Sequence, residues 1–202
     1  HCQRQGRKGV KDMDPQKIKR LGELYRKELL ESVLPFWLRF GVDRAHGGFL
    51  HCLERDGTLY SGDKSGWFQG RGTWAFARAY NTVEQRPEWL EAARNGYTFL
   101  LEKCFDTDGR MFFELTRDGR PIRKRRYWFA EAFGVSALAE YYRATGDAQV
   151  LEKARALFEK IVTYYHNPGL FPPKYIAENF QVKSHNVRMV MVATAQAMRE
   201  AA

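Results

Sequence analysis

The sequence has 202 residues, of which 44% are hydrophobic and 14% aromatic, and 33 Lys and Arg against 24 Asp and Glu give a formal charge of +9. This amount of apolar material excludes a wholly disordered chain, and the length suits one domain or part of a larger one. No apolar run approaches the roughly 20 residues that a membrane-spanning helix needs, so we expect no membrane partner.

The excess positive charge gathers in two places. They are residues 1–12 and the run Arg120, Arg123, Lys124, Arg125 and Arg126. Basic runs can bind nucleic acid, but no nucleic-acid motif accompanies either one. We therefore favour a solvated tail and a solvated hairpin strand, and we expect no nucleic-acid partner.

The N-terminus has the character of a tail. Met13 followed by Asp-Pro looks like a natural start, so residues 1–12 are interpreted as a basic tail or as residues upstream of that start, and residues 13–202 as the folded part. The basic start is not followed by the apolar stretch of a signal peptide.

The cysteines and histidines predict no metal site. Cys2, Cys52 and Cys104 lack the spacing of metal ligands, and no two histidines form a His-x-x-x-His pair. An odd number of cysteines without a secretory signal is typical of reduced thiols, so we expect a cytoplasmic protein.

The first predicted element is a helix over residues 16–40, where apolar residues such as Ile18, Leu21 and Tyr25 recur at three- and four-residue steps. Pro35 is expected to bend this helix or to end its regular part. Residues 47–60 then predict a β-hairpin, because the pair Asp56-Gly57 is a strong hairpin signal.

Helices follow over residues 67–83 and 87–104, and Pro87 suits the first turn of the second one. A second hairpin is centred on Asp118-Gly119. The remaining helices are predicted over residues 127–145, 147–166 and 185–202, with Gly146 ending the first and Asp147 capping the second. The pattern predicts an all-α class: roughly six helices in pairs, with short β-hairpins between them.

An internal repeat connects the two hairpin segments. Arg55-Asp56-Gly57 returns as Arg117-Asp118-Gly119 at a spacing of 62, and Trp67-Phe68 returns as Trp128-Phe129 at a spacing of 61. A unit of one hairpin and two helices cannot bury both of its faces alone, so we expect the units to stack.

Several ordered segments resemble the N-acylglucosamine 2-epimerase family, which includes the renin-binding protein. They are residues 46–53 with 67–71, residues 115–121 with 129–131, and residues 142–147. The resemblance implies an (α/α)6 toroid of about 400 residues, of which this chain would supply the N-terminal half. It also implies a sugar 2-epimerase or isomerase that needs no metal or redox cofactor. Such an enzyme would interconvert N-acetylglucosamine and N-acetylmannosamine, or a related aldose, by proton transfer at C2.

Arg71 is the expected catalytic residue. The resemblance implies that it reaches the sugar, and a guanidinium beside the carbonyl oxygen would stabilise the enediolate that forms when the C2 proton leaves. The alternative is an ordinary surface arginine paired with Asp or Glu.

The expected substrate-binding residues are Trp67, Gln69, Glu131, His185 and Asn186. Glu131 would hydrogen-bond sugar hydroxyls or pair with Arg71, and we favour the pairing because a charge on an inner helix needs a partner. Asn186 would bind the sugar or cap the last helix. Trp67 is more readily a core residue than a stacking face, and His185 more readily an exposed side chain.

Two alternatives to the epimerase remain open. A glycosidase on the same toroid would use two carboxylates, for which Glu54, Glu114 and Glu131 are available but not specifically paired. A non-catalytic α/α-repeat module would bind another protein through its open apolar edge.

The resemblance places both proton-transferring histidines in the C-terminal half, so we assign no base here and expect the chain to be an incomplete, inactive portion. The expected partner is a small sugar, and a homodimer stays open.

Overall fold

The computed structural model describes residues 14–124, 127–172 and 185–202. It divides into two units, residues 1–37 and 38–202, which are treated separately. The basic tail over residues 1–12, and Arg125 and Arg126 of the second basic run, lie outside the described residues.

The first unit is a helix that changes its winding near a proline. Helix α1 (Pro15–Glu28) begins at Asp14, whose carboxylate accepts a hydrogen bond from the Gln16 N–H at 3.0 Å. Regular α geometry then gives way to a π-helical turn over Leu29–Val33, followed by the short α2 (Leu34–Phe36). Pro35 lacks an N–H, and the wider turn beside it lets the Leu34 N–H reach the Leu29 carbonyl. The regular part thus ends before Pro35, while the helical course continues past it.

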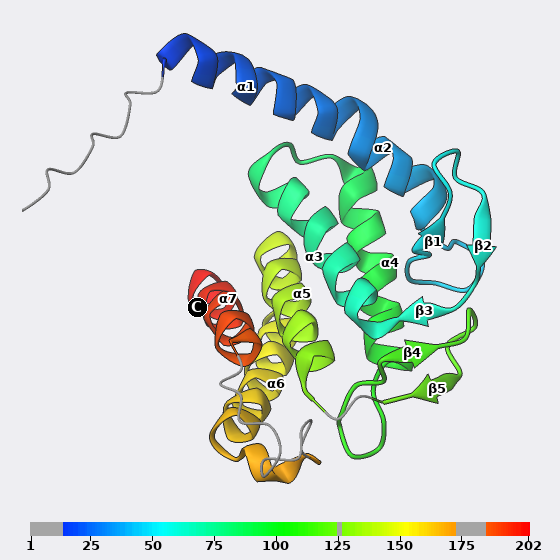
Figure 1. Cartoon of the computed structure of the whole chain (residues 1–202), viewed down its shortest axis with the longest axis vertical. Coiled ribbons are helices and arrows are strands. Elements are labelled where there is room, and N and C mark those ends of the chain that lie inside the picture. The colour runs from blue at the N-terminus through cyan, green and yellow to red at the C-terminus, as the bar shows by residue number, and fades with distance from the viewer. Residues whose placement is uncertain (1–13, 125–126, 173–184) are drawn as a thin grey trace, which may run out of the picture. The chain divides into compact units, whose positions relative to one another are not determined.

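The second unit consists of paired helices. They are α3 (Gly66–Thr82), α4 (Pro87–Lys103), α5 (Phe129–Thr145), α6 (Ala148–His166) and α7 (Asn186–Ala201). Helices α3, α5 and α7 begin at the same end of the unit and pack in that order, with α4 against α3 and α6 against α5 (Figure 1). This is the inner and outer arrangement of an (α/α) toroid, which confirms the expected fold class.

The predicted helix ends hold to within one or two residues. Pro87 occupies the first turn of α4, and Gly146 ends α5 with φ +71°. The Asp147 carboxylate caps α6 by accepting from the Gln149 N–H at 2.9 Å. Each of these residues supplies the backbone geometry or acceptor that a helix end needs.

Short strands connect the helices. Strand β1 (Cys52–Leu53) pairs with β2 (Leu59–Ser61), and β3 (Lys64–Ser65), β4 (Glu114–Leu115) and β5 (Pro121–Arg123) form an antiparallel sheet in that order. The first repeat therefore contributes β3 to the sheet of the second repeat. This shared sheet holds the starts of α3 and α5 together.

The two hairpins are built alike. The Glu54 N–H donates to the Thr58 carbonyl at 2.9 Å, and 62 residues later the Thr116 N–H donates to the Arg120 carbonyl at 2.8 Å. Gly57 and Gly119 both have φ +89°, which L side chains rarely adopt. The repeat read from the sequence is thus a repeat of backbone hydrogen bonds.

A buried ion cluster fixes the hairpins to each other. The Lys64 ammonium is 3.0 Å from Asp43 and is fully buried, and the Arg117 Nε lies 2.9 Å from the same carboxylate. Burial alone raises the pKa of Asp43, but the hydrogen bonds from Arg117 and Lys64 outweigh it and lower the pKa to about 2. Burial lowers the pKa of Lys64.

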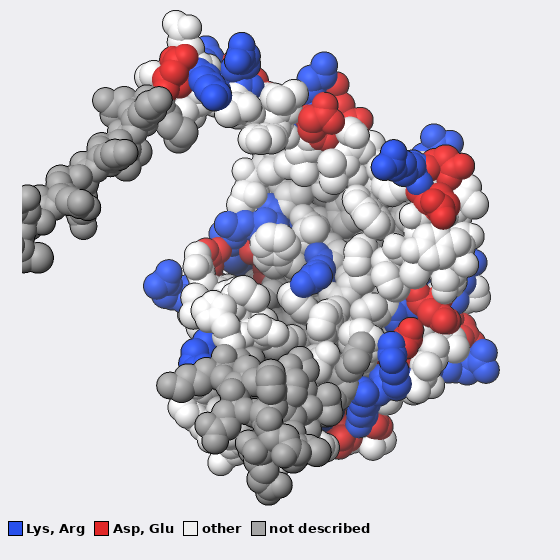
Figure 2. Space-filling view, in the orientation of Figure 1, with Lys and Arg blue, Asp and Glu red and all other residues white. Residues whose placement is uncertain are grey.

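The described part of the second basic cluster is neutralised by neighbouring acids. Arg120 pairs with Asp118 at 3.0 Å, Arg123 with Glu114 at 2.5 Å, and Lys124 with Asp108 at 2.8 Å. Figure 2 shows acidic and basic side chains interspersed along this side of the molecule. This pairing supports the interpretation of a solvated strand.

No helix within the described ranges is both long and apolar enough to cross a membrane. Among those same residues Cys52 and Cys104 are free thiols, and burial raises the pKa of Cys104 to about 12, so this thiol is held protonated.

Candidate functional site

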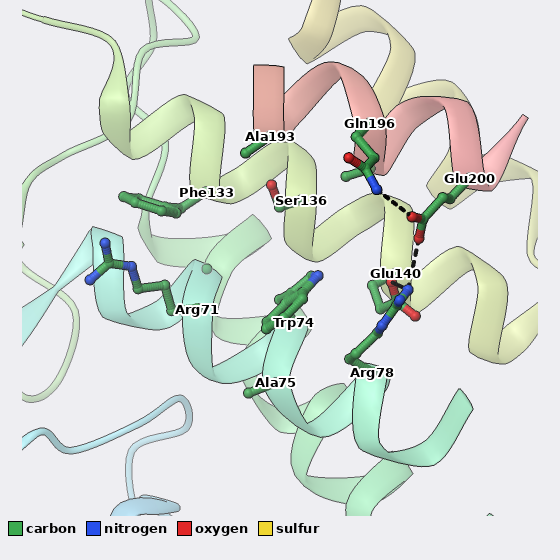
Figure 3. A pocket seen from close by; sticks show the side chains of 12 residues that line it. Arg71, Trp74, Ala75, Arg78, Phe133, Ser136, Glu140, Ala193, Gln196 and Glu200 are labelled. Atoms are coloured by element: carbon green, nitrogen blue, oxygen red, sulfur yellow. Dashed lines mark hydrogen bonds and ion pairs between the residues drawn. The ribbon is translucent and has the colours of Figure 1, made fainter. Parts of the chain in front are cut away.

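A pocket of about 530 Å³ lies between the three inner helices, α3, α5 and α7 (Figure 3). Its wall combines two aromatic rings and several small residues with charged side chains. The lining residues are Gly70, Arg71, Trp74, Ala75, Arg78, Phe133, Ser136, Glu140, Ala193, Gln196, Ala197 and Glu200.

The lining follows the internal repeat. Equivalent positions lie 62 residues apart between α3 and α5 and 60 apart between α5 and α7, so each level of the pocket takes one residue from each helix. The three levels are Arg71, Phe133 and Ala193; then Trp74, Ser136 and Gln196; then Arg78, Glu140 and Glu200. Helix α7 is therefore the inner helix of a third repeat.

Arg71 lies at the level of the pocket nearest the helix starts. Its side chain is exposed, and its guanidinium carbon lies 4.1 Å from the centroid of the Phe133 ring. Within the described part of the chain no carboxylate pairs with it, so the alternative of an ion-paired surface arginine finds no partner there. The guanidinium is thus held against an aromatic ring, which does not neutralise its charge.

The opposite end of the pocket is closed by ion pairs. Arg78 Nη1 donates to Glu140 at 3.2 Å and to Glu200 at 2.8 Å, and Arg143 Nη1 lies 3.0 Å from Glu140. Hydrogen bonds from Gln196 and Arg78 lower the pKa of Glu200. These pairs connect all three inner helices and occupy both pocket carboxylates.

Gln69 holds backbone and lies away from the pocket wall. Its side chain is fully buried, accepts from the Phe49 N–H at 2.7 Å and donates to the Phe49 carbonyl at 2.9 Å. Both hydrogen-bonding groups of the amide are engaged, so the geometry supports a structural role. Gln69 is not among the residues that line the pocket, and substrate binding by Gln69 stays a prediction.

Glu131 is the repeat equivalent of Gln69, again at a spacing of 62. Its Oε1 accepts from the Met111 N–H at 3.0 Å and from Arg110 Nε at 3.0 Å, and it is fully buried. The expected pairing of Glu131 with Arg71 is therefore wrong: Arg110, from the loop that Glu131 holds, is the partner. The second oxygen, Oε2, is buried without a hydrogen bond from the described residues.

Trp67 is half-buried in an aromatic cluster beside the pocket. Its ring packs edge-on against Phe113 at 5.2 Å and lies 5.8 Å from Phe133, measured between centroids. Its indole N–H is buried and finds no acceptor in the described ranges. This environment agrees with a core role for Trp67, one turn before Arg71.

His185 and Asn186 stand at the start of α7. Both are exposed, and neither belongs to the pocket lining. Asn186 is the first helical residue, after His185 at the cap position, and no side-chain capping bond is formed there. The pocket thus brings together Arg71 and residues that sequence reasoning did not select, and it leaves these two outside.

Phe133, Ser136 and Gln196 were missed from the sequence. The signal was present for Phe133, because it stands 62 residues after Arg71. The same spacing connects Ser136 to Trp74, whereas Gln196 required knowledge that α7 is a third repeat, which the sequence motifs did not reveal.

Within the described chain, neither a metal-type cluster of side chains nor the acids considered for a glycosidase form part of this pocket. No group of three or more His, Cys, Asp or Glu suited to a metal ion occurs there. Of the three acids considered for a glycosidase, Glu131 is buried, Glu114 pairs with Arg123, and Glu54 is exposed on its hairpin. None of the three lines the pocket.

Comparisons with known proteins agree with this architecture. Over 139 residues the chain is 40% identical to the N-acylglucosamine 2-epimerase of Bos taurus, covering 67% of this chain and 33% of that protein. It is 33% identical over 138 residues to the cellobiose 2-epimerase of Ruminococcus albus, covering 67% and 35%. The structure of cellobiose 2-epimerase from Bacillus thermoamylovorans matches with a TM-score of 0.78 at 26% identity, over 91% of this chain and 51% of that one.

The matched region spans about a third of the length of the curated relatives and about half of the solved structure. The model of the family N-acylglucosamine 2-epimerase (GlcNAc 2-epimerase) matches residues 48–201, which include both hairpins and all five helices of the second unit. The chain belongs to the N-acylglucosamine 2-epimerase family.

Proposed function

We propose that this chain supplies the arginine side of a sugar 2-epimerase site, in a protein that interconverts N-acetylglucosamine and N-acetylmannosamine or a related aldose. The observation that carries the proposal is Arg71: an exposed guanidinium on an inner helix, facing a pocket of about 530 Å³ and held by an aromatic ring. The names of the matching family and of the bovine relative point to the same chemistry.

The reaction needs a stabilised oxyanion. In the open-chain sugar the C2–H bond breaks, its proton passes to a base, and the electron pair moves through C1–C2 onto O1, giving an enediolate from an aldose or the corresponding enolate where C2 carries an N-acyl group. Return of a proton to the opposite face of C2 gives the epimer. Donors fixed beside the developing charge stabilise it most, and loss of one such donor typically costs about a hundredfold or more in rate.

The base belongs to the proposal only by resemblance. None of the described histidines, His46, His51, His166 and His185, is among the residues that line the pocket. We therefore keep the expectation that two histidines outside this chain transfer the proton and that the chain alone does not turn over. The cytoplasmic location and a homodimer stay predictions.

The glycosidase alternative is less well supported by the same pocket. The two carboxylates that line the pocket, Glu140 and Glu200, both pair with Arg78 and both contact Arg143. A general acid must hold a proton near neutral pH, whereas hydrogen bonds from Gln196 and Arg78 lower the pKa of Glu200.

The experiment is a binding titration, because binding does not require the missing base. An aldonohydroxamate, such as mannonohydroxamate, has a planar oxygen pair that mimics an enediolate, and its affinity can be measured by calorimetry. We expect wild-type binding, and a loss of about 10- to 100-fold in Arg71→Met, the range of a hydrogen bond to a charged group.

Arg94→Met is the matched control, because Arg94 is an exposed arginine that pairs with Glu91 on α4 and lies outside the pocket. It should bind as the wild type does. No binding by the folded wild type at millimolar hydroxamate, or equal binding by Arg71→Met, would reject the proposed site. Parallel C2 proton exchange in deuterated water tests the base: turnover by the chain alone would show that a base is present within it.

A further inference from the structure

We propose that Phe133 is a positioning residue for Arg71: its ring holds the guanidinium in the pocket without a carboxylate, so that the positive charge stays available for an oxyanion. The contact between Phe133 and Arg71 does not depend on the reaction, whereas the ligand that Arg71 would bind rests on the proposed function.

The contact is that of a cation lying over an aromatic ring. The Arg71 guanidinium carbon lies 4.1 Å from the ring centroid, and Figure 3 shows the ring of Phe133 beside the Arg71 side chain at the mouth level. A carboxylate partner would occupy the N–H donors and neutralise the charge. An aromatic face attracts the cation without using a donor, so the arginine is ordered and still available.

The ring itself is clamped. On α3 the residues Trp67 and Arg71 are one turn apart, which places them on the same helix face, and both contact Phe133. The Trp67 ring lies 5.8 Å from the Phe133 ring at an interplanar angle of 57°. Phe133 therefore contacts both an aromatic ring and the guanidinium from the same helix.

The backbone fixes the distance between the two helices. A Cβ atom on Gly70 would lie 2.7 Å from the carbonyl carbon and oxygen of Phe133. Only glycine permits this approach of α3 to α5, immediately before Arg71 in the sequence. The ring is thus anchored through its own backbone against the helix that carries the arginine.

Ordering a long side chain in advance strengthens ligand binding, because a free arginine loses rotamer freedom when a ligand fixes it. Replacing the ring by a branched aliphatic side chain removes the face contact but keeps much of the apolar volume. We expect the affinity for an oxyanion to fall about tenfold in Phe133→Leu, within the usual range of a cation–π contact.

The first readout is the mobility of the Arg71 side chain, followed by ¹⁵N relaxation of its Nε–Hε group and assigned by its disappearance in Arg71→Met. We expect an order parameter near that of rigid backbone, about 0.8, in the wild type and in Phe133→Tyr, and below about 0.6 in Phe133→Leu. Phe133→Met serves as a second variant without a ring if the leucine variant does not fold.

The second readout is the affinity for mannonohydroxamate in the same variants. Phe129→Leu is the matched control: Phe129 also contacts Trp67, with centroids 6.0 Å apart, but does not line the pocket. We expect Phe133→Tyr to stay within about twofold of the wild type, since its ring keeps the face contact.

Each outcome decides one point. An ordered Arg71 in Phe133→Leu, or an equal loss of order in Phe129→Leu, overturns the positioning role. Order that is lost in Phe133→Leu alone, with a tenfold loss of affinity, supports it. Order that depends on Phe133 in a protein that does not bind the hydroxamate supports the geometry and rejects the proposed function.

Discussion

Gly70 provides a direct test of how closely the inner helices approach. Gly70→Ala improves helix propensity by about 1 kcal/mol, but its new methyl group would lie 2.7 Å from the Phe133 carbonyl. Backbone atoms cannot rotate away, so α5 must shift, and overpacking of this kind typically costs about 1–3 kcal/mol. With a collision of this closeness we expect the upper part of that range, for a net loss of about 1–2 kcal/mol.

Gly134→Ala is the matched control in the facing helix. Its methyl group would meet the Met111 sulfur at 2.8 Å and a Leu157 methyl at 3.1 Å, both of them ends of flexible side chains. The collision is relieved by a rotamer change, so the propensity gain of up to about 1 kcal/mol largely survives. The two variants should therefore differ by about 2 kcal/mol.

Urea unfolding followed by circular dichroism measures this difference. With a slope of about 2–3 kcal/mol per molar urea, the midpoint of Gly70→Ala should lie about 0.7–1 M below that of Gly134→Ala at equal slopes. Equal midpoints, or a Gly70→Ala variant more stable than the wild type, would refute the close approach of α3 and α5 and weaken the argument for a clamped Phe133.

Three further predictions concern the hydrogen bonds and ion pairs around the site. Gln69→Glu places a carboxylate against the Phe49 carbonyl, so thermal melts at pH 7 should reveal a loss of about 3 kcal/mol that is partly regained at pH 4, where a protonated acid can donate. The pKa of Asp43 is lowered to about 2, below its usual 3.8. Its stabilisation is therefore complete above about pH 4 and lost as the pH falls through 2, and Asp43→Asn should flatten this part of the stability profile. Glu200→Gln removes the carboxylate that joins α7 to Arg78 and Arg143, so amide exchange in α7 should become severalfold faster while α4 exchanges as before.

The sequence predicted the helices well because their ends carry strong local signals. Pro87, Gly146 and Asp147 each act through one residue's own backbone or side chain, without help from distant parts of the chain. The offset of the two tryptophan pairs, 61, was one residue short: the hydrogen bonds of Gln69 and Glu131 give 62. Helix α5 begins one residue later in its repeat than α3 does in its own, so the matching tryptophans do not occupy equivalent positions. Sequence identity alone did not reveal this difference.

The site was harder to predict, because polar residues with similar spacing serve different purposes. Gln69 and Arg71 are two residues apart, and on a helix they point in different directions, one to the backbone of the first hairpin and the other to the pocket. Glu131 was expected to pair with Arg71, yet an arginine 21 residues upstream in the sequence reaches it first. Which partner wins depends on where the loop folds, and no local pattern encodes that.

The third repeat escaped the motif search for a related reason. Helix α7 shares positions with α3 and α5 rather than residue types: Arg78, Glu140 and Glu200 occupy one level, but only the two acids are alike. The repeat is therefore recognised from the equivalent positions of these residues and from the ion pairs between them, in which one cation faces two carboxylates, and not from sequence identity.

The most direct test of the account is a crystal structure of the chain with mannonohydroxamate bound. We predict that the hydroxamate oxygens lie within hydrogen-bonding distance of the Arg71 guanidinium, with the guanidinium still over the Phe133 ring. A ligand bound instead at Glu140 and Glu200, or one that leaves Arg71 turned to solvent, would contradict the assignment of this pocket to C2 chemistry.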